Sequence, residues 1–227
     1  MSHSEEFPPK QRTRALNAYN KEIAVIARML ASGYQGLEED SKTIYKEKKD
    51  LVLKIESRLR EVLIVSLINN FQSYISDLLR DVLINYPGSI ESRKIDIRLV
   101  FQAASLEDLR KDIIDEQVDK LAYSSFEDLN RYFIDKMSFS LVDSEIKMLR
   151  FRYLIEARNS ITHNRGYFNK TSLKKLNGVR SRVAKRIYSP KAIKALDYIN
   201  SMVMDIDRRA IEKFGLRIMS SDGRSEG

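Results

Sequence analysis

Apolar residues recur at helical intervals along most of the chain. Near the amino end, one set recurs mostly at spacings of three and four: Ala15, Leu16, Tyr19, Ile23, Ile26 and Leu30. This spacing is typical of an amphipathic helix. We expect that helix to stop before Gly33 and Gly36, with an acidic loop after it, because glycine is a poor helix former. Residues 1 to 12 lack the pattern and are expected to be a disordered tail.

The longest helical pattern extends from about Lys42 to Asn85, and Pro87 and Gly88 end it. Its first half is highly charged, whereas its second half, VLIVSLINNFQSYISDLLRDVLI, is apolar on nearly every side. A helix of the second kind needs partners on most sides, so we expect it at the centre of the core. The predicted apolar stripe contains Ile55, Leu59, Val62, Leu63, Phe71, Tyr74, Ile75, Leu78 and Val82.

Shorter helices are predicted in the middle of the chain. The segment IDIRLVFQ, residues 95 to 102, could be a strand, but a lone strand has nothing obvious to pair with, so we interpret it as helical. Ser105 and Ser125 are each followed by an aspartate three residues later, which resembles the start of a capped helix. They predict helices at about 106 to 122 and 126 to 137.

Two further helices are predicted toward the carboxyl end. Ser144 can cap the first, which ends near His163 and Gly166. Its apolar seam consists of Ile146, Leu149, Tyr153, Leu154, Ala157 and Ile161. Ser189 followed by proline predicts the start of the last helix, which Gly215 ends. The predicted fold is therefore all-α, an antiparallel helical bundle that forms a single domain over residues 13 to 215, with a disordered tail at 216 to 227.

Composition narrows the possible chemistry. No apolar run approaches the roughly 20 residues that a membrane helix needs, and the first residues lack the apolar segment of a secretion signal, so we expect a cytoplasmic protein without membrane contact. The chain has no cysteine, which excludes disulfides, thiolate metal sites and a cysteine nucleophile. With His3 in the expected tail, His163 is the one useful histidine, so a zinc site is not expected, although oxygen ligands for magnesium remain open. Walker, GxGxxG and GxSxG motifs are absent, and no cofactor is expected.

Positive charge is concentrated in one part of the sequence. The net charge of the chain is +8, but residues 1 to 144 carry 21 Lys and Arg against 24 Asp and Glu, whereas residues 145 to 215 carry 17 against six. Such a field attracts polyanions, nucleic acids above all, although a merely solvated basic face is the alternative. The candidate nucleic-acid contacts are Arg165, Lys170, Lys174, Lys175, Arg180 and Arg182, followed by Lys185 and Arg186.

The segment EARNSITHNRG, residues 156 to 166, brings three polar side chains to one helix end. Asn159 and His163 are four residues apart and share a helix face, and the long side chain of Arg158 can reach the same place. These types suit cleavage of RNA by its own 2′-hydroxyl: imidazole transfers a proton near neutral pH, and guanidinium stabilises charge on the phosphate. A histidine that interacts only with the helix dipole is the structural alternative.

The segment LIEARNSITHNRGYFN resembles the signature of the HEPN superfamily, R-N-x-x-x-H followed by a small residue or glycine, with Arg158, Asn159, His163 and Gly166 at the matching positions. The segment from 67 to 90 is similar to an early core helix of the RiboL-PSP-type branch, except that Gln72 stands where a glutamate is frequent. The resemblance extends over about residues 50 to 214.

This resemblance implies a helical homodimer in which two motifs face one another across a shared cleft. It also implies a metal-independent endoribonuclease that leaves a cyclic phosphate, with toxin-antitoxin, stress or antiviral defence as its setting and an antitoxin or other regulatory protein as a partner. Arg158, Asn159 and His163 are then the expected catalytic residues. A catalytically inactive helical module that binds nucleic acid or a partner protein through residues 145 to 215 is the second hypothesis.

Overall fold

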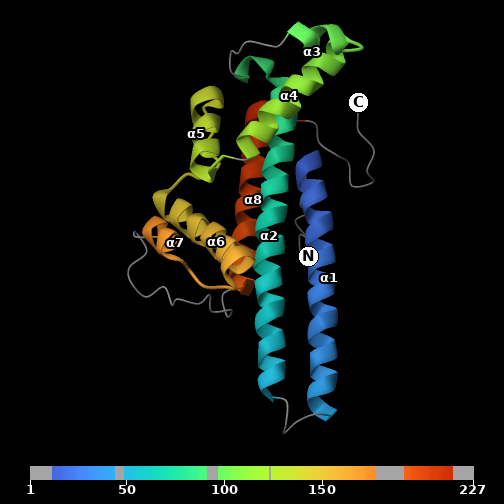
Figure 1. Cartoon of the computed structure of the whole chain (residues 1–227). Helices are drawn as coiled ribbons and strands as arrows, with labels where there is room; N and C mark the ends of the chain where they lie inside the picture. Colours follow the sequence, from blue (N-terminus) through green and yellow to red (C-terminus); the bar gives the residue numbers. More distant parts are fainter. Residues whose placement is uncertain (1–11, 44–48, 91–96, 123, 177–191, 217–227) are drawn as a thin grey trace, which may run out of the picture. The chain divides into compact units, whose positions relative to one another are not determined.

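The computed structural model describes residues 12–43, 49–90, 97–122, 124–176 and 192–216, and every regular element in these ranges is helical (Figure 1). The all-α prediction is therefore confirmed at this level. The elements are α1 (Arg14–Thr43), α2 (Lys49–Asn85), the short 3-10 helix η1 (Pro87–Ser89), α3 (Ile97–Gln102), α4 (Leu106–Ala122), α5 (Phe126–Met137), α6 (Glu145–Asn164), α7 (Lys170–Lys175) and α8 (Ala192–Phe214). No described helix combines the length and apolarity that a membrane crossing requires.

Several predicted helix ends agree with the structure. Ser125 accepts a hydrogen bond from the backbone N–H of Asp128, and Ser144 accepts one from Lys147, as N-caps do. The backbone N–H of Asp108 donates to Ser105 in the same way. The predicted start of the last helix at Ser189 and the two predicted disordered tails, apart from Arg12 and Leu216, lie outside the described residues.

The prediction that the first helix stops before Gly33 is wrong, because α1 continues through both glycines and through the acidic segment after them. A Cβ atom at Gly33 would lie 3.3 Å from Leu59 Cδ1, which is closer than most side chains approach one another. Gly33 therefore permits α1 and α2 to approach closely. The close contact favours a small residue at this position, which offsets the low helix propensity of glycine.

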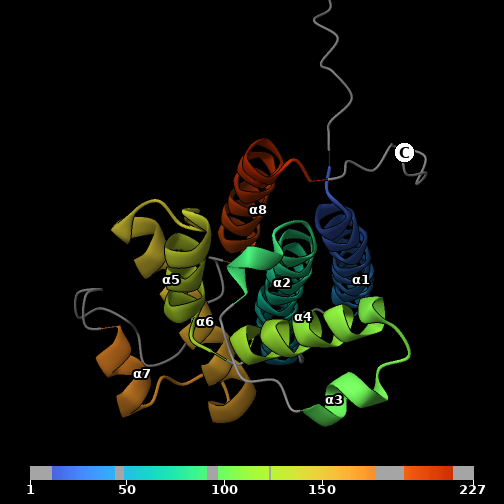
Figure 2. The ribbon, with the colours of Figure 1, turned by 90° about the horizontal axis from the view of Figure 1, so that it is seen from above.

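The helices form two compact units, and α1, α2 and α8 contribute residues to both. One unit contains residues 19–73 and 140–202. In it, α1 and α2 lie antiparallel (Figures 1 and 2): Asn70 Nδ2 donates to the Tyr19 carbonyl at 3.1 Å, while Gly33 lies against Leu59. The core of this unit includes Leu67, Ile68 and Phe71 from α2, all fully buried.

The other unit contains residues 1–18, 74–139 and 203–227. Here α4 crosses the last turns of α2 (Figure 2), and Arg80 of α2 is paired with Asp115 of α4 at 2.8 Å. Near the end of α8 the buried Phe214 ring lies 5.3 Å from that of the buried Phe139 and 5.4 Å from that of Tyr86, which is exposed. The second half of α2 contributes core residues to both units, but it keeps an exposed face that includes Val62, Asn69 and Gln72, so the prediction of burial on most sides is correct only in part.

Individual positions in the predicted apolar stripes differ from expectation. Val62 and Ile146 are exposed at 52% and 65%, so they do not belong to the core seams of α2 and α6. The buried Phe151, whose ring lies 4.6 Å from that of Phe71, takes part in the α6 seam instead. The chosen apolar faces were therefore correct only in part.

A buried carboxylate joins the first residues of α1 to α8. Asp207 is 1% exposed and accepts hydrogen bonds from the Thr13 backbone N–H at 3.3 Å, from the Thr13 hydroxyl and from Tyr74 at 3.4 Å. Burial raises the pKa of the Asp207 carboxyl above its ordinary value, although the hydrogen bonds from Thr13 and Tyr74 act in the opposite direction. The folded state therefore holds a proton on Asp207 more readily than the unfolded chain does.

We predict that Asp207→Asn changes the pH dependence of stability. A carboxyl group with a raised folded pKa stabilises the fold below its unfolded pKa of about 4 and loses this contribution as the pH rises through the folded value. The free energy of unfolding of the wild type, minus that of the variant, should therefore fall with pH above about 4. Urea titrations from acid to neutral pH would measure this, with the exposed Asp112→Asn as a matched control, and a difference that rises with pH would contradict it.

Candidate active site on α6

The carboxyl end of α6 is closed by two residues in the left-handed backbone region. Arg165 has φ of 53° and Gly166 has φ of 82°, and the Gly166 backbone N–H donates to the Ser160 carbonyl at 2.9 Å. A Cβ atom at Gly166 would lie 3.2 Å from Glu61 Oε1, and Glu61 is a buried residue of α2. Both the positive φ and this close approach favour glycine at 166.

Arg158 is held by two amide side chains. Its Nε and Nη2 both donate to Asn69 Oδ1, at 3.0 and 2.8 Å, and its Nη1 donates to Asn159 Oδ1 at 3.0 Å. These bonds use three of the five N–H groups of the guanidinium. Neither partner is charged, and among the described residues no carboxylate is bonded to Arg158. The positive charge is thus fixed in position but remains available to an anion.

His163 lies in the last turn of α6 and is exposed. It follows Asn159 by four residues and therefore shares a helix face with it. It has no hydrogen bond or ion pair within the described part of the chain. The structure therefore brings Arg158 and Asn159 into contact and leaves the imidazole of His163 accessible to solvent near them on the same helix.

Asn69 is a site residue that the sequence did not reveal. It lies on α2, 89 residues before Arg158 in the chain, and no local motif connects the two. Gln72, which stands where a glutamate is frequent in the resembled branch, lies one turn further along α2. It is exposed and has no hydrogen bond to the described residues. The tertiary packing of α2 against α6 is therefore the only signal that identifies Asn69.

Glu156 is buried on α6 and is bonded to Lys175 Nζ of α7 at 2.9 Å. Helix α7, which was not predicted from the sequence, is capped by Asn169, whose Oδ1 accepts a hydrogen bond from the Ser172 N–H at 2.8 Å. The charge of Lys175 is therefore already compensated, although the side chain remains more than half exposed.

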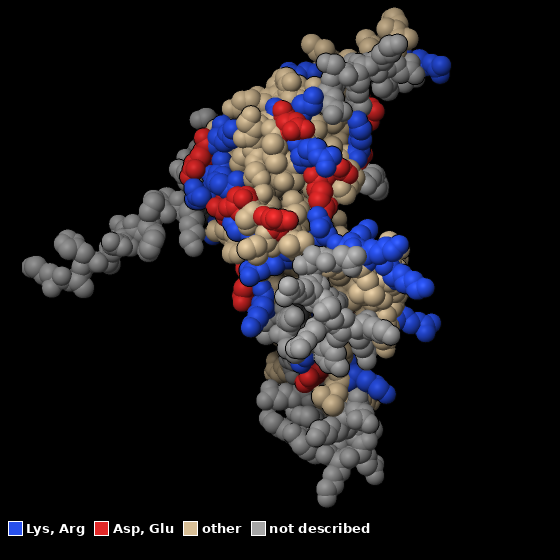
Figure 3. Space-filling model, turned by 90° about the vertical axis from the view of Figure 1, so that its left-hand side faces the viewer, with Lys and Arg blue, Asp and Glu red and all other residues tan. Residues whose placement is uncertain are grey.

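Of the other predicted nucleic-acid contacts, three lie on the described surface and the rest lie outside the described residues. Arg165, Lys170 and Lys174 are exposed around the end of α6 and on α7, and Lys and Arg side chains predominate over Asp and Glu in the lower part of the surface in Figure 3. Arg180 and Arg182, like Lys185 and Arg186, lie outside the described residues. The described basic surface near the site thus consists of three uncompensated cations, in addition to Arg158 and Lys175.

The two aromatic residues after α6 have different positions. Phe168 is buried and packs against Tyr153, with the ring centroids 5.8 Å apart, whereas Tyr167 is 49% exposed. Burial raises the pKa of the Tyr153 hydroxyl, so this group stays protonated at neutral pH and does not act as a base. Phe168 belongs to the core beneath the site, and Tyr167 belongs to its surface.

The described residues contain no group of three or more His, Asp or Glu side chains placed to hold a metal ion. No family model, curated protein or solved structure matches the chain.

We predict that Gly166→Ala destabilises the protein more than Gly215→Ala. Both glycines have positive φ, so each substitution should cost about 1 kcal/mol from backbone strain. Gly215 has open space around its missing Cβ, whereas an added methyl at Gly166 must also displace Glu61. Denaturant unfolding of the two variants would compare them, and equal losses of stability would contradict the proposed close approach.

Proposed function

We propose that the chain is a metal-independent endoribonuclease with a HEPN-like fold, in which Arg158, Asn159 and His163 act on RNA in the cytoplasm. The observation that carries this proposal is the guanidinium of Arg158, which two amide oxygens orient and none of the described carboxylates neutralises. An exposed imidazole follows it on the same helix. This combination provides a fixed positive charge and a proton-transfer group, which are the two requirements for cleavage by a neighbouring hydroxyl.

In the proposed reaction, the 2′-oxygen of a ribose attacks the adjacent phosphorus. The new 2′-O–P bond forms as the P–O5′ bond breaks, so the products are a 2′,3′-cyclic phosphate and a 5′-hydroxyl. A base takes the proton of the 2′-hydroxyl, and an acid gives a proton to the leaving 5′-oxygen. Arg158 stabilises the additional negative charge on the phosphate oxygens, and Asn159 holds the guanidinium in place.

The reaction needs both a base and an acid, but His163 is the single histidine outside the amino-terminal segment. We propose that two copies pair and that the partner's His163 supplies the second group. Arg165, Lys170 and Lys174 contact the RNA backbone in this arrangement, because they surround the end of α6. By the same family resemblance, the activity belongs to toxin-antitoxin, stress or antiviral defence, with an antitoxin or regulatory protein as a partner.

We predict that the purified protein cleaves labelled single-stranded RNA in the presence of EDTA. His163→Ala and Arg158→Ala should each lower the rate by about 100-fold or more, since they remove proton transfer and charge stabilisation. Arg158→Lys should also fail, because an ammonium cannot reproduce the bonds that the guanidinium fork makes to Asn69 and Asn159. Arg150→Ala, an exposed arginine on the same helix, is the matched control.

The product ends decide the chemistry, since a 2′,3′-cyclic phosphate indicates attack by the 2′-hydroxyl. Cleavage that chelation abolishes, or that survives in both site variants, would refute the proposal. RNA retention without cleavage, weakened by salt and unaffected by His163→Ala, would instead support the inactive binding module.

We further predict that Asn69 positions Arg158. Asn69→Ala should lower the cleavage rate by about 10-fold while RNA binding is retained, because the charge remains but its orientation is lost. Asn69→Asp keeps the acceptor but neutralises Arg158, so it should lower the rate further. Ser73→Ala, at another exposed position of α2, is the control. An Asn69→Asp variant as active as the wild type would contradict this role.

A further inference from the structure

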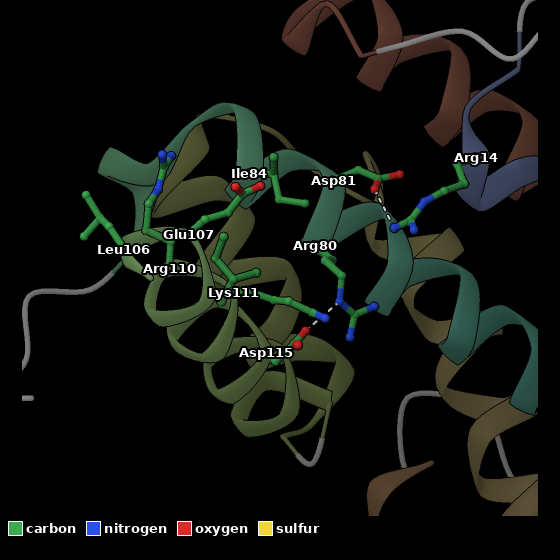
Figure 4. A pocket seen from close by; sticks show the side chains of 10 residues that line it. Arg14, Arg80, Asp81, Ile84, Leu106, Glu107, Arg110, Lys111 and Asp115 are labelled. Carbon is green, nitrogen blue, oxygen red and sulfur yellow. Dashed lines mark hydrogen bonds and ion pairs between the residues drawn. The ribbon is translucent and has the colours of Figure 1, made fainter. Parts of the chain in front are cut away.

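A cavity of about 730 Å³ lies in the unit that contains α3, α4 and α5. It is formed by the first turn of α1, the last turns of α2 and the first half of α4 (Figure 4). Its size falls within the range of about 300 to 1,000 Å³ that is usual for small-molecule sites in proteins. The residues of the candidate active site belong to the other unit, so this cavity is a separate feature.

The wall of the cavity contains charged residues that form ion pairs with one another and charged residues that do not. Four basic and three acidic residues line it. Arg14 is bonded to Asp81 and Arg80 to Asp115, both at 2.8 Å, and these pairs are drawn in Figure 4. The remaining charged residues of the lining, Glu107, Arg110 and Lys111, come from the first turns of α4. Among the described residues, Arg110 and Lys111 have no ion-pair partner.

The same cavity exposes apolar surface. Leu106 is 74% exposed and Ile84 is 51% exposed, while Ile114 is buried at the cavity wall. Exposed leucine and isoleucine side chains beside two unpaired cations are suited to a ligand that removes the apolar groups from water. Such burial stabilises a complex in proportion to the apolar area that is removed from water.

From this combination we infer that the cavity binds an amphiphilic small molecule, with an apolar body and one phosphate or carboxylate head group. The body packs against Leu106, Ile84 and Ile114. The head group pairs with Arg110 or Lys111, whose charged ends extend toward opposite ends of the wall in Figure 4, since Arg14 and Arg80 are already bonded to aspartates. The excess of one positive charge in the wall favours a head group of low charge, because the three carboxylates repel a polyanion.

Binding of defined probes to the full chain, measured by calorimetry, tests this inference. Octyl phosphate and octanoate have both parts of the expected ligand and distinguish a phosphate from a carboxylate head. Inorganic phosphate and acetate lack the body, and 1-octanol lacks the charge. We expect saturable binding of octyl phosphate, octanoate or both, at least 10-fold tighter than that of any single-part probe.

The variant Arg110→Gln/Lys111→Gln should weaken this binding by at least 10-fold. Leu106→Ser should weaken it too, while leaving the response to salt unchanged. Arg131→Gln/Lys136→Gln removes two exposed basic residues of α5, outside the cavity, and should bind like the wild type. All these positions are exposed, so the variants should fold, and a circular dichroism melt checks this.

Absence of saturable binding for both amphiphiles would overturn the inference. Equal affinity for octanol, or unchanged affinity in the Arg110→Gln/Lys111→Gln variant, would overturn it as well. The RNA-cleavage assay is independent of all these outcomes, because it probes α6 and not α4.

Discussion

Burial of the second half of α2 is the constraint on which both units depend. Leu67, Ile68 and Phe71 are fully buried in one unit, and full burial of such a side chain contributes about 1.5 to 3 kcal/mol. Asn69 lies between two buried residues of this helix, and one of them, Asn70, is also bonded to the Tyr19 carbonyl. The core therefore fixes the backbone of Asn69, and Asn69 in turn orients the guanidinium of Arg158. The proposed chemistry depends on packing that contains no catalytic group.

The polar partners of the cations in this unit decide which of them can attract a phosphate. Lys175 is bonded to the buried carboxylate of Glu156, so its charge is largely compensated. Arg158 has only amide oxygens as partners, which orient it without cancelling its charge. An exposed ion pair stabilises a protein by at most about 1 kcal/mol, so stability gains little from neutralising Arg158. A carboxylate at position 69 would, however, remove its attraction for a phosphate. The difference between the two cations therefore favours Arg158 as the functional one.

Local signals in the sequence identified most helix boundaries, but contacts between helices could not be found in this way. Ser125 was identified as a cap from the aspartate three residues later, and Ser144 from its place just before an apolar seam with helical spacing. The prediction that the first helix stops at Gly33 was wrong, because Gly33 lies within α1 at the point where Leu59 of α2 approaches closely. The motif at Arg158 could be recognised in the sequence. Asn69 could not, because it lies 89 residues before Arg158 and no local pattern connects the two. Helical periodicity also placed Ile146 wrongly in the buried seam of α6. An apolar residue near a helix start can remain in solvent without large cost.

Buried carboxylates explain how a strongly basic segment can form an ordered helix end. Glu61 and Glu156 are both 4% exposed, and each is bonded to a cation, Arg58 or Lys175, whose side chain is more than half exposed. A buried carboxylate without such a partner would cost several kcal/mol, so each cation is held where its carboxylate lies. Glu61 also lies against Gly166, and Glu156 joins α6 to α7. The two acidic residues therefore fix the last turns of α6 from both α2 and α7, and they reduce the repulsion among the surrounding lysines and arginines near the exposed His163.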